Sequence, residues 1–535
     1  MTTTLADAGR LLFTGAEWDF PMLRRITDAI EPIALGEFGL DTYRNQIEVI
    51  TSEQMLDAYA AIGMPVFYRH WSFGKQFVRQ EELYRKGARG LAYEIVINSS
   101  PCISFLMEGN TATMQTLVIA HACFGHNHFF KNNYLFKEWT DAEGILDYLQ
   151  FAKAYVAKCE EKYGVRRVEL TLDAAHALMG QGVFRSPHTS RPTEKKRLAR
   201  EADRVRYQLA HWDDTLERTT AFAHRDQAGT TARQHSGGIP DGALPEENIL
   251  YFIEKWAPRL SVWQRELLRI VRNVAQYFYP QGQTKVMNEG CATYVHYRTM
   301  RRLLEEGRIS EGNYLEFLQS HTNVVFQPAF NDPFYSGFNP YALGFAMMRD
   351  IERICTGVAE DGTPSTDAQL EEDRQWFPEI AGNGDPWGTL RSIWANYRDE
   401  SFIGQFLSPK LMRDFRMFHL SDSQDEKHFV VEAIGDEHGY RDIRRTLARA
   451  YDTGASGLNI EIVGVNLRGS RKLRLDHRIT RGQLLEEDDG RRVMQHLANL
   501  WGYAVECRSV DEDGVEYAKL QAKPDDAGLR AFGSR

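Results

Sequence analysis

The sequence predicts a mainly α-helical protein of the α+β class, with a large helical domain at residues 1–450 and a small C-terminal α/β domain at residues 451–535. Three observations lead to this prediction. Apolar residues recur at helical intervals in long segments that begin with capping residues. From about residue 457 onward, apolar and polar residues alternate instead, as they do in strands. A chain of 535 residues is also too long for one ordinary hydrophobic core, so at least two folding units are expected.

The first part of the large domain contains both extended and helical signals. Residues 92–97 are expected to form a strand or the start of a buried helix. Thr140 and Glu143 have the spacing of a capping box, which predicts a helix that ends near Gly164. A further helix is predicted at residues 166–179.

Three more helices are predicted in the second part of the large domain. Ser261 and Gln264 again have capping-box spacing, and we expect Pro280 to end the helix that they begin. A second helix is predicted at residues 286–306, where a glycine follows. The third is expected to begin at Asn339-Pro340, because proline suits the first helical position.

Two regions differ from this helical pattern. Residues 186–247 are polar and interrupted by glycine and proline, so we expect an exposed insertion. The C-terminal domain is predicted to be a β-β-α-β-β unit, with strands at 457–467, 472–479, 504–510 and 515–520 and a helix at 489–500.

Composition and short motifs narrow the functional classes. The net charge of −10 and pI of about 5.9 argue against a nucleic-acid partner, and the basic run at 194–204 is interpreted as a solvated helix face. The six cysteines form no C-x-x-C pair, which favours reduced thiols in the core. Without a phosphate-binding glycine motif, no nucleotide cofactor is expected. Without a leader or an apolar run of about 20 residues, we expect a cytoplasmic protein with no membrane span.

Three histidines lie within eight residues at the end of an apolar segment: His121, His126 and His128. On an ideal helix, His121 and His128 share a face, whereas His126 points about 140° away from His121. His121 and His126 can point the same way if the helix ends or bulges near Gly125. Neutral imidazole suits zinc or iron, so a metal site is one interpretation, and a buried hydrogen-bonded histidine cluster is the other.

A second constellation lies in the helix predicted at residues 286–306. Glu289 and His296 are seven residues apart and share one helix face, with the small residue Ala292 between them. A carboxylate and an imidazole in an apolar helix must either pair with each other or bind something. The two interpretations are therefore a buried Glu–His hydrogen bond and a contribution to the same metal site.

The Asn288-Glu289-Gly-x-Ala segment resembles the helix that supplies the glutamate ligand in gluzincin-type zinc peptidases, which place an H-E-x-x-H helix earlier in the chain. The segment that carries His121 and His126 and the segment that carries Glu289 would form a gluzincin-like helix pair. This sequence departs from the pattern, because its histidines are five apart and Ala122 stands where the general-base glutamate belongs. Glu94 and Glu108 lie upstream and could fold into the site.

The candidate site residues follow from this comparison. We expect His121, His126 and Glu289 to bind zinc or iron, with His296 as a fourth ligand or a proton carrier. Glu289 and His296 are also the candidate catalytic residues. A polar and aromatic stretch, residues 321–341, either lines a cleft or forms a rigid loop; its candidate cleft residues are Asn331, Asp332, Tyr335, Asn339 and Tyr341.

Long phrases of the sequence resemble the SpoVR (stage V sporulation protein R) family, from about residue 15 to about residue 505. They include YEIVINSSPCISFLMEGNT, IAHACFGHNHFFKNNYLF, YPQGQTKVMNEGCATYVHY and NPYALGFAMMRDIERI. The family motifs carry over onto His121, His126, Asn288, Glu289 and His296, and less securely onto His128. The resemblance implies a link to the spore cortex or to stress physiology. It also implies two partners from the same operon, a serine protein kinase and a protein with a von Willebrand-type domain.

Two functions are therefore expected. The first is a divergent metal-dependent hydrolase that acts on an amide-type bond in a cell-wall precursor or a peptide. The second is a non-catalytic regulator or scaffold that works with the partner serine protein kinase, which the alanine at position 122 favours. The first requires His121, His126, Glu289 and His296 to converge, whereas the second allows them to lie apart or to pair within the core.

Overall fold

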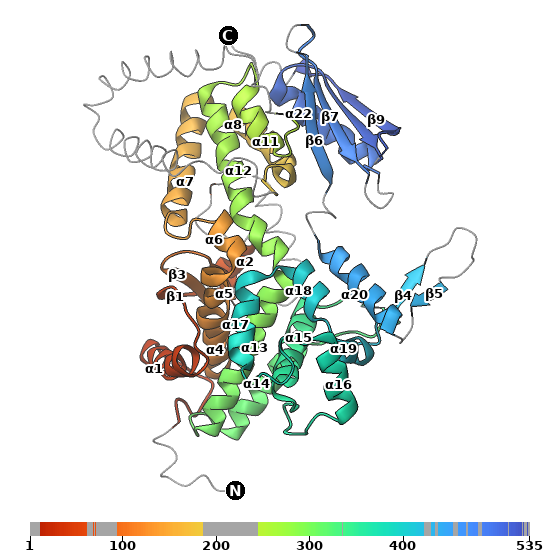
Figure 1. Cartoon of the computed structure of the whole chain (residues 1–535). Coiled ribbons are helices and arrows are strands. Elements are labelled where there is room, and N and C mark those ends of the chain that lie inside the picture. Colours follow the sequence, from red (N-terminus) through yellow and green to blue (C-terminus); the bar gives the residue numbers. More distant parts are fainter. Residues whose placement is uncertain are drawn as a thin grey trace. The chain divides into compact units, whose positions relative to one another are not determined.

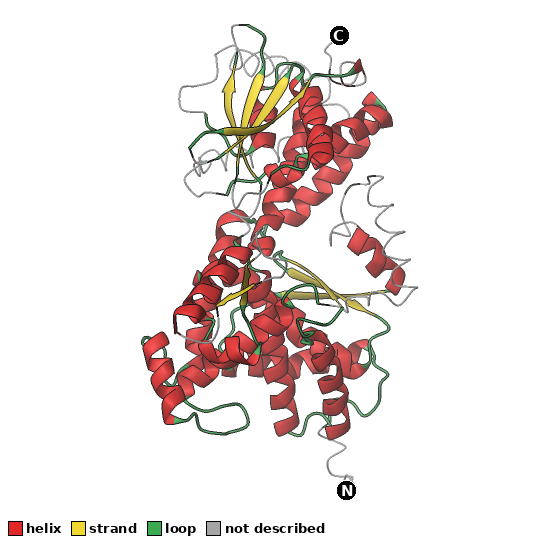
Figure 2. Ribbon diagram, turned by 90° about the vertical axis from the view of Figure 1, so that its right-hand side faces the viewer, coloured by secondary structure: helices red, strands yellow, loops and turns green. Residues whose placement is uncertain are grey.

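The computed structural model describes most of the chain. The described residues are 11–60, 68, 70, 94–185, 244–333, 335–421, 430–433, 437–452, 458–466, 469–479, 484–511, 513–526, 528 and 532. The insertion predicted at residues 186–247 lies outside them except for its last four positions, and the basic run at 194–204 lies wholly outside. Helices, red in Figure 2, make up most of the described part, so the predicted mainly α-helical fold is confirmed.

The chain divides into two compact units. The first combines Met1–Ala157 with Tyr277–Ser456, and the second combines Lys158–Gln276 with Gly457–Arg535. The expected division near residue 450 lies close to the end of the first unit, but the second unit also contains residues 158–276, which the sequence analysis assigned to the large domain. The physical reason is that the C-terminal helix α22 (Glu487–Trp501) packs against α8 (Val165–Ala177) within this unit.

The first unit begins with helices around a small sheet. The elements in order are α1 (Phe20–Glu31), the π-helix η1 (Pro32–Glu37), β1 (Asn45–Ile50), α2 (Ser52–Ala60), β2 (Glu94–Ile97), β3 (Cys102–Met107), α4 (Ala112–Val118), the π-helix η2 (Ile119–His126), α5 (Asn127–Asn132) and α6 (Tyr134–Trp139). The sheet order is β1-β3-β2, with β1 parallel and β2 antiparallel to β3. Of the two structures expected for residues 92–97, the strand is therefore the observed one.

The rest of the first unit is helical apart from one short hairpin. Its elements are α13 (Lys285–Glu305), α14 (Glu311–Val324), α15 (Pro340–Thr356), α16 (Asp367–Trp376), α17 (Pro386–Asn396), α18 (Asp399–Phe406), α19 (Pro409–Asp414), β4 (His419–Ser421), β5 (Val430–Ala433) and α20 (Glu437–Tyr451). Helices α7 (Ile145–Tyr163) and α12 (Val262–Gln283) run from one unit into the other.

Helix α13 is the centre of the first unit. It lies side by side with α15 (Figure 1) and packs along η2. Gly290 and Gly344 allow the close contact with α15, because a Cβ atom on Gly344 would lie 2.2 Å from the carbonyl oxygen of Val286. Asp399, at the start of α18, accepts hydrogen bonds from the backbone N–H groups of Val286 (2.8 Å) and Met287 (2.9 Å), so the N-terminus of α13 is capped by a distant side chain.

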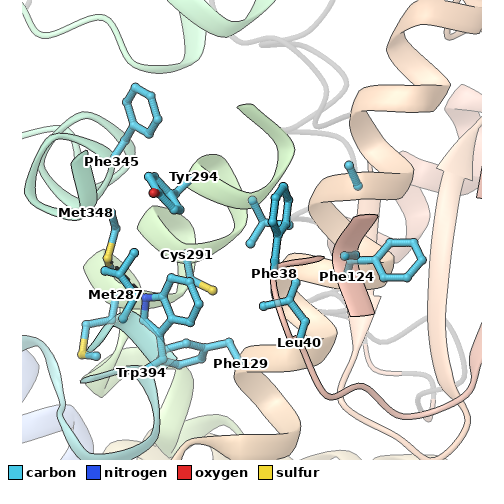
Figure 3. Close-up of a cluster of buried hydrophobic side chains, with 14 of the residues drawn as sticks. Phe38, Leu40, Phe124, Phe129, Met287, Cys291, Tyr294, Phe345, Met348 and Trp394 are labelled. Atoms are coloured by element: carbon cyan, nitrogen blue, oxygen red, sulfur yellow. Dashed lines mark hydrogen bonds between the residues drawn. The ribbon is translucent and has the colours of Figure 1, made fainter. Parts of the chain in front are cut away.

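A large hydrophobic core surrounds this helix. Side chains of α13, α15, α17, α5 and η2 meet there, as Figure 3 shows. Trp394 is fully buried in this cluster, and its indole N–H points to the sulfur of Met348 at 3.2 Å. The core therefore holds α13 and η2, the two segments that carry most of the predicted site residues, in one packed body.

Most of the predicted helix boundaries are confirmed. The predicted capping box at Thr140 is wrong, because Thr140 is the C-cap of α6 and α7 begins at Ile145. Helices α7, α8, α13 and α15 begin and end within a few residues of the predictions. Helix α12, however, does not end at Pro280 but continues to Gln283. Pro280 removes only one backbone hydrogen bond from the helix. The last turn is retained because the Thr284 hydroxyl donates to the Pro280 carbonyl (2.7 Å). Tyr277, which is buried, also anchors this part of the helix by donating to the carbonyl of Asn98 (2.9 Å).

The second unit contains the predicted β-β-α-β-β motif, which is confirmed. Its elements are α8, η3 (Met179–Gln181), α11 (Ile249–Trp256), β6 (Asn459–Val465), β7 (Leu473–Arg478), α22, β8 (Val505–Val510) and β9 (Glu516–Ala522). The sheet order is β6-β7-β8-β9, in which β7 and β8 are parallel and are joined through α22. All six cysteines are buried, and none of them forms a disulfide bond. Among the described residues, no helix is both long and apolar enough to cross a membrane.

Candidate metal centre

The π-helix η2 brings His121 and His126 together. Residues five apart diverge on an α-helix, but the wider turn of a π-helix, with its i→i+5 hydrogen bonds, aligns them. The ring centroids of His121 and His126 lie 4.6 Å apart. Of the two possibilities that the five-residue spacing left open, a helix end or a bulge near Gly125, the bulge is the observed one. The same change of phase separates His128, whose Nδ1 instead accepts from the backbone N–H of Asp41 at 2.9 Å.

Gly125 allows α13 to approach the two histidines. A Cβ atom at this position would lie 2.5 Å from Cα of Ala292, so only glycine permits this separation of η2 and α13. As a result, Oε2 of Glu289 lies 3.6 Å from Nε2 of His126 and 3.9 Å from Nε2 of His121. The small residue predicted to permit a close approach at position 292 makes this contact with Gly125.

Glu94, on the earlier strand β2, also belongs to the cluster. Strand β2 pairs with β3 so that Glu94 is opposite Leu106, and β2 contacts η2. The Oε1 atom of Glu94 lies 3.4 Å from Nε2 of His121, and the ligand atoms of Glu94, His121 and His126 all lie within 4.8 Å of one another. Of the two upstream glutamates that the sequence offered, Glu94 belongs to this group and Glu108 does not.

The electrostatics of the cluster are those of buried carboxylates without a strong cation. Burial raises the pKa of Glu94 to about 8, and the charge of Glu289 adds to this increase. Among the described residues, imidazole nitrogens lie 3.4 to 3.9 Å from the carboxylate oxygens of both glutamates, and Oε2 of Glu289 accepts no hydrogen bond. Burial and the neighbouring histidines hold the pKa of His121 well below its usual range. The His121 ring is therefore neutral, as a metal ligand must be.

Further polar side chains contact the Nδ1 atoms of the two histidines, which are the ring nitrogens that do not face the glutamates. Nδ1 of His126 lies 2.9 Å from Oδ1 of Asn288, and Nδ1 of His121 lies 2.8 Å from Nδ1 of His296. Nε2 of His296 in turn lies 3.0 Å from Nδ1 of His321, on α14. Both ring nitrogens of His296 thus face other histidines, an arrangement that differs from the fourth-ligand role expected for it, because neither nitrogen is left for an ion.

The candidate cleft residues of the stretch 321–341 take separate roles. Tyr341 stacks near His121, with ring centroids 6.5 Å apart. Asn339 caps α15, with its side chain accepting from the N–H of Tyr341. Asn331 and Tyr335 line a different hollow of about 770 Å³, together with aromatic residues such as Phe330 and Phe418. His321 lies at the start of the stretch, and its role was not predicted because no local pattern links it to His296.

The fold and the cluster define the class of this protein: a mainly helical α+β protein with a buried histidine–glutamate cluster between a π-helix, a strand and a helix. Residues 17–456 match the family described as SpoVR like protein, and residues 458–512 match the SpoVR-like C-terminal domain. The chain belongs to the SpoVR family. It is 50% identical over 513 residues to a protein of Escherichia coli (strain K12) described as "Uncharacterized protein YcgB", a match that covers 96% of this chain and 95% of that protein. A search of solved structures found no match.

Proposed function

We propose that this protein is a metal-dependent hydrolase with a single zinc or iron ion held by Nε2 of His121, Nε2 of His126 and the carboxylate of Glu289. Two observations support the proposal: the ligand atoms of His121 and His126 lie within 4.8 Å of each other and of Glu94, and Oε2 of Glu289 lies 3.6 and 3.9 Å from Nε2 of His126 and His121. Two imidazoles and carboxylate oxygens are a donor set that suits either ion.

The separations between the ligand atoms fit one ion. Two ligands that are about 2.05 Å from a tetrahedral zinc ion lie about 3.3 Å apart. The contacts here are 3.4 Å for Glu94 and His121, 3.6 Å for Glu289 and His126, and 3.9 Å for Glu289 and His121. Oε2 of Glu289 also supports the proposal, because a buried carboxylate oxygen that accepts no hydrogen bond is costly unless it binds a cation.

The proposed reaction is the hydrolysis of an amide-type bond in a cell-wall precursor or a peptide. A bound ion would polarise the carbonyl group and make water more acidic. In this proposal Glu94, whose Oε1 lies 3.4 Å from Nε2 of His121, would take a proton from the attacking water and return it to the departing amine, the role that Ala122 cannot perform. Glu94 and Glu289 keep 17% and 16% of their side-chain surface exposed, which supports access by a substrate.

The first test is elemental analysis of protein that has been purified without a tag or chelator. We expect wild type to carry about one equivalent of zinc or iron, and His121→Ala and Glu289→Gln to lose it. Glu94→Gln should keep the metal and lose the amide hydrolysis measured on cell-wall peptides. Glu108→Gln is the matched control, because Glu108 is a nearby glutamate outside the cluster, and it should keep both properties. Wild type without metal after reconstitution with zinc or iron would refute the proposal.

A second candidate is a non-catalytic regulator with a closed structural metal site, acting with a partner serine protein kinase. The contact of Glu94 with His121, the shortest of the three, favours it, because a fourth protein ligand would leave no position for water. The same variants distinguish the two functions. If Glu94→Gln loses the metal as fully as Glu289→Gln does, Glu94 is a ligand, the site is closed, and the regulatory function is preferred.

A further inference from the structure

We propose that His296 and His321 are positioning residues that form a buried chain of hydrogen bonds and hold His121 in the tautomer that a metal ligand needs. This inference rests on the metal site proposed above and assigns a role to two residues that do not touch the ion. The chain runs from η2 through α13 to α14, and all three histidines are buried, with 5% or less of their surface exposed.

The geometry makes this chain directional. A hydrogen bond between two ring nitrogens needs one N–H group and one lone pair, and a neutral imidazole carries one N–H. If Nδ1 of His121 donates to Nδ1 of His296, then Nε2 of His296 carries the proton and donates to Nδ1 of His321. In the reverse direction all three rings change tautomer together, and the proton of His121 moves to Nε2.

The forward direction is the one that metal binding selects. Nε2 of His121 faces Glu94 and Glu289, and it can bind an ion only through a free lone pair. Its proton must then reside on Nδ1, which lies 2.8 Å from Nδ1 of His296; the backbone of Ala292 also hydrogen-bonds to His121. His296 can accept there only while its own proton is on Nε2, and the acceptor at Nδ1 of His321 favours that state.

The second histidine ligand is held in the same way. Nδ1 of His126 donates to the amide oxygen of Asn288, which leaves its Nε2 free to face Glu289. Asn288 and His296 both belong to α13, as Glu289 does. One rigid helix therefore supplies a proposed ligand and the groups that orient the other two, so the relative positions of all three depend on a single element.

The test compares two substitutions of His321. His321→Phe removes the acceptor and fits the surroundings, because the ring is packed among Phe345, Tyr297 and Phe317 at centroid distances of 4.7, 5.0 and 5.6 Å. His321→Asn keeps an acceptor oxygen near the position of Nδ1. In a zinc titration against a chromophoric chelator, we expect His321→Phe to bind zinc about tenfold more weakly, at the lower end of the effects of second-layer partners, and His321→Asn to bind nearly as wild type does.

A second measurement tests the hydrogen-bonded histidine chain independently of whether the protein binds a metal. In protein labelled with ¹⁵N at histidine, the ¹⁵N shifts report which ring nitrogen carries the proton. We expect His121 to be protonated at Nδ1 when zinc is bound, and just one of the two facing Nδ1 atoms of His121 and His296 to be protonated without zinc. Protons on both or on neither would overturn the chain, even if wild type binds no metal. If wild type binds zinc and a folded His321→Phe variant binds it equally well, the chain is refuted and the metal site stands.

Discussion

Replacing Gly125 by alanine tests whether the packing of η2 on α13 builds the site. The added Cβ atom would lie 2.5 Å from Cα and 2.9 Å from Cβ of Ala292. Carbon atoms in contact are about 3.5 Å apart, so the two segments have to separate by about 1 Å. The backbone of α13 cannot rotate away as a flexible side chain would, so the displacement is carried to Glu289, one turn earlier on the same helix.

We expect two consequences. Overpacking of this kind reduces the free energy of unfolding by about 1–3 kcal/mol. A shift of about 1 Å in Glu289 also exceeds the tolerance of about 0.2 Å on metal–ligand distances, so zinc binding should be lost or greatly weakened. Urea denaturation measures the first effect, and a chelator competition titration measures the second.

Gly282→Ala is the matched control. Gly282 is an exposed glycine in α12, and a Cβ atom there would meet nothing within 4 Å. Alanine at this position should stabilise the protein by up to about 1 kcal/mol, because it restricts the unfolded chain and favours the helix. If Gly125→Ala unfolds at the same urea concentration as wild type and binds zinc equally well, the argument that close packing of η2 on α13 builds the site is wrong.

Three further predictions concern the packing and charges of the two units. Burial alone would raise the pKa of Glu254, but Arg272, Arg269 and Lys255 lower it to about 2. Glu254→Gln should therefore reduce the free energy of unfolding by about 3 kcal/mol at pH 7, by the size of that shift. Urea denaturation across pH should show this loss disappear as the pH falls from about 4.5 to 2. Arg353 is buried against Asp350 (2.8 Å) and Asp373 (2.6 Å), so Arg353→Met should destabilise the protein by about 3–5 kcal/mol in the same assay, because it leaves two carboxylates unpaired. Trp394→Ala should lower the free energy of unfolding by about 3–5 kcal/mol, because it empties the fully buried core position shown in Figure 3; a loss below about 1 kcal/mol would mean that this core is not closely packed.

Much of the architecture could be predicted from the sequence because its signals are local. Helical periodicity and capping residues predicted α7, α8, α13 and α15, and alternation predicted the four strands and the helix of the C-terminal motif. The five-residue spacing of His121 and His126 predicted that the helix ends or bulges near Gly125, since no regular α-helix can direct both side chains to one point, and η2 is that bulge. Each of these inferences depends on residues within about two turns of one another.

The tertiary structure alone decided how distant segments combine. It joined residues 158–276 to the C-terminal sheet, carried α12 past Pro280, and brought Glu94 and His321 to the histidines from β2 and α14. Glu94 lies 27 residues before His121 in the sequence, and His321 lies 25 residues after His296. No periodicity extends across such separations. The contacts form because the packing of η2, α13 and α14 in one core brings their buried polar side chains within hydrogen-bond distance of one another.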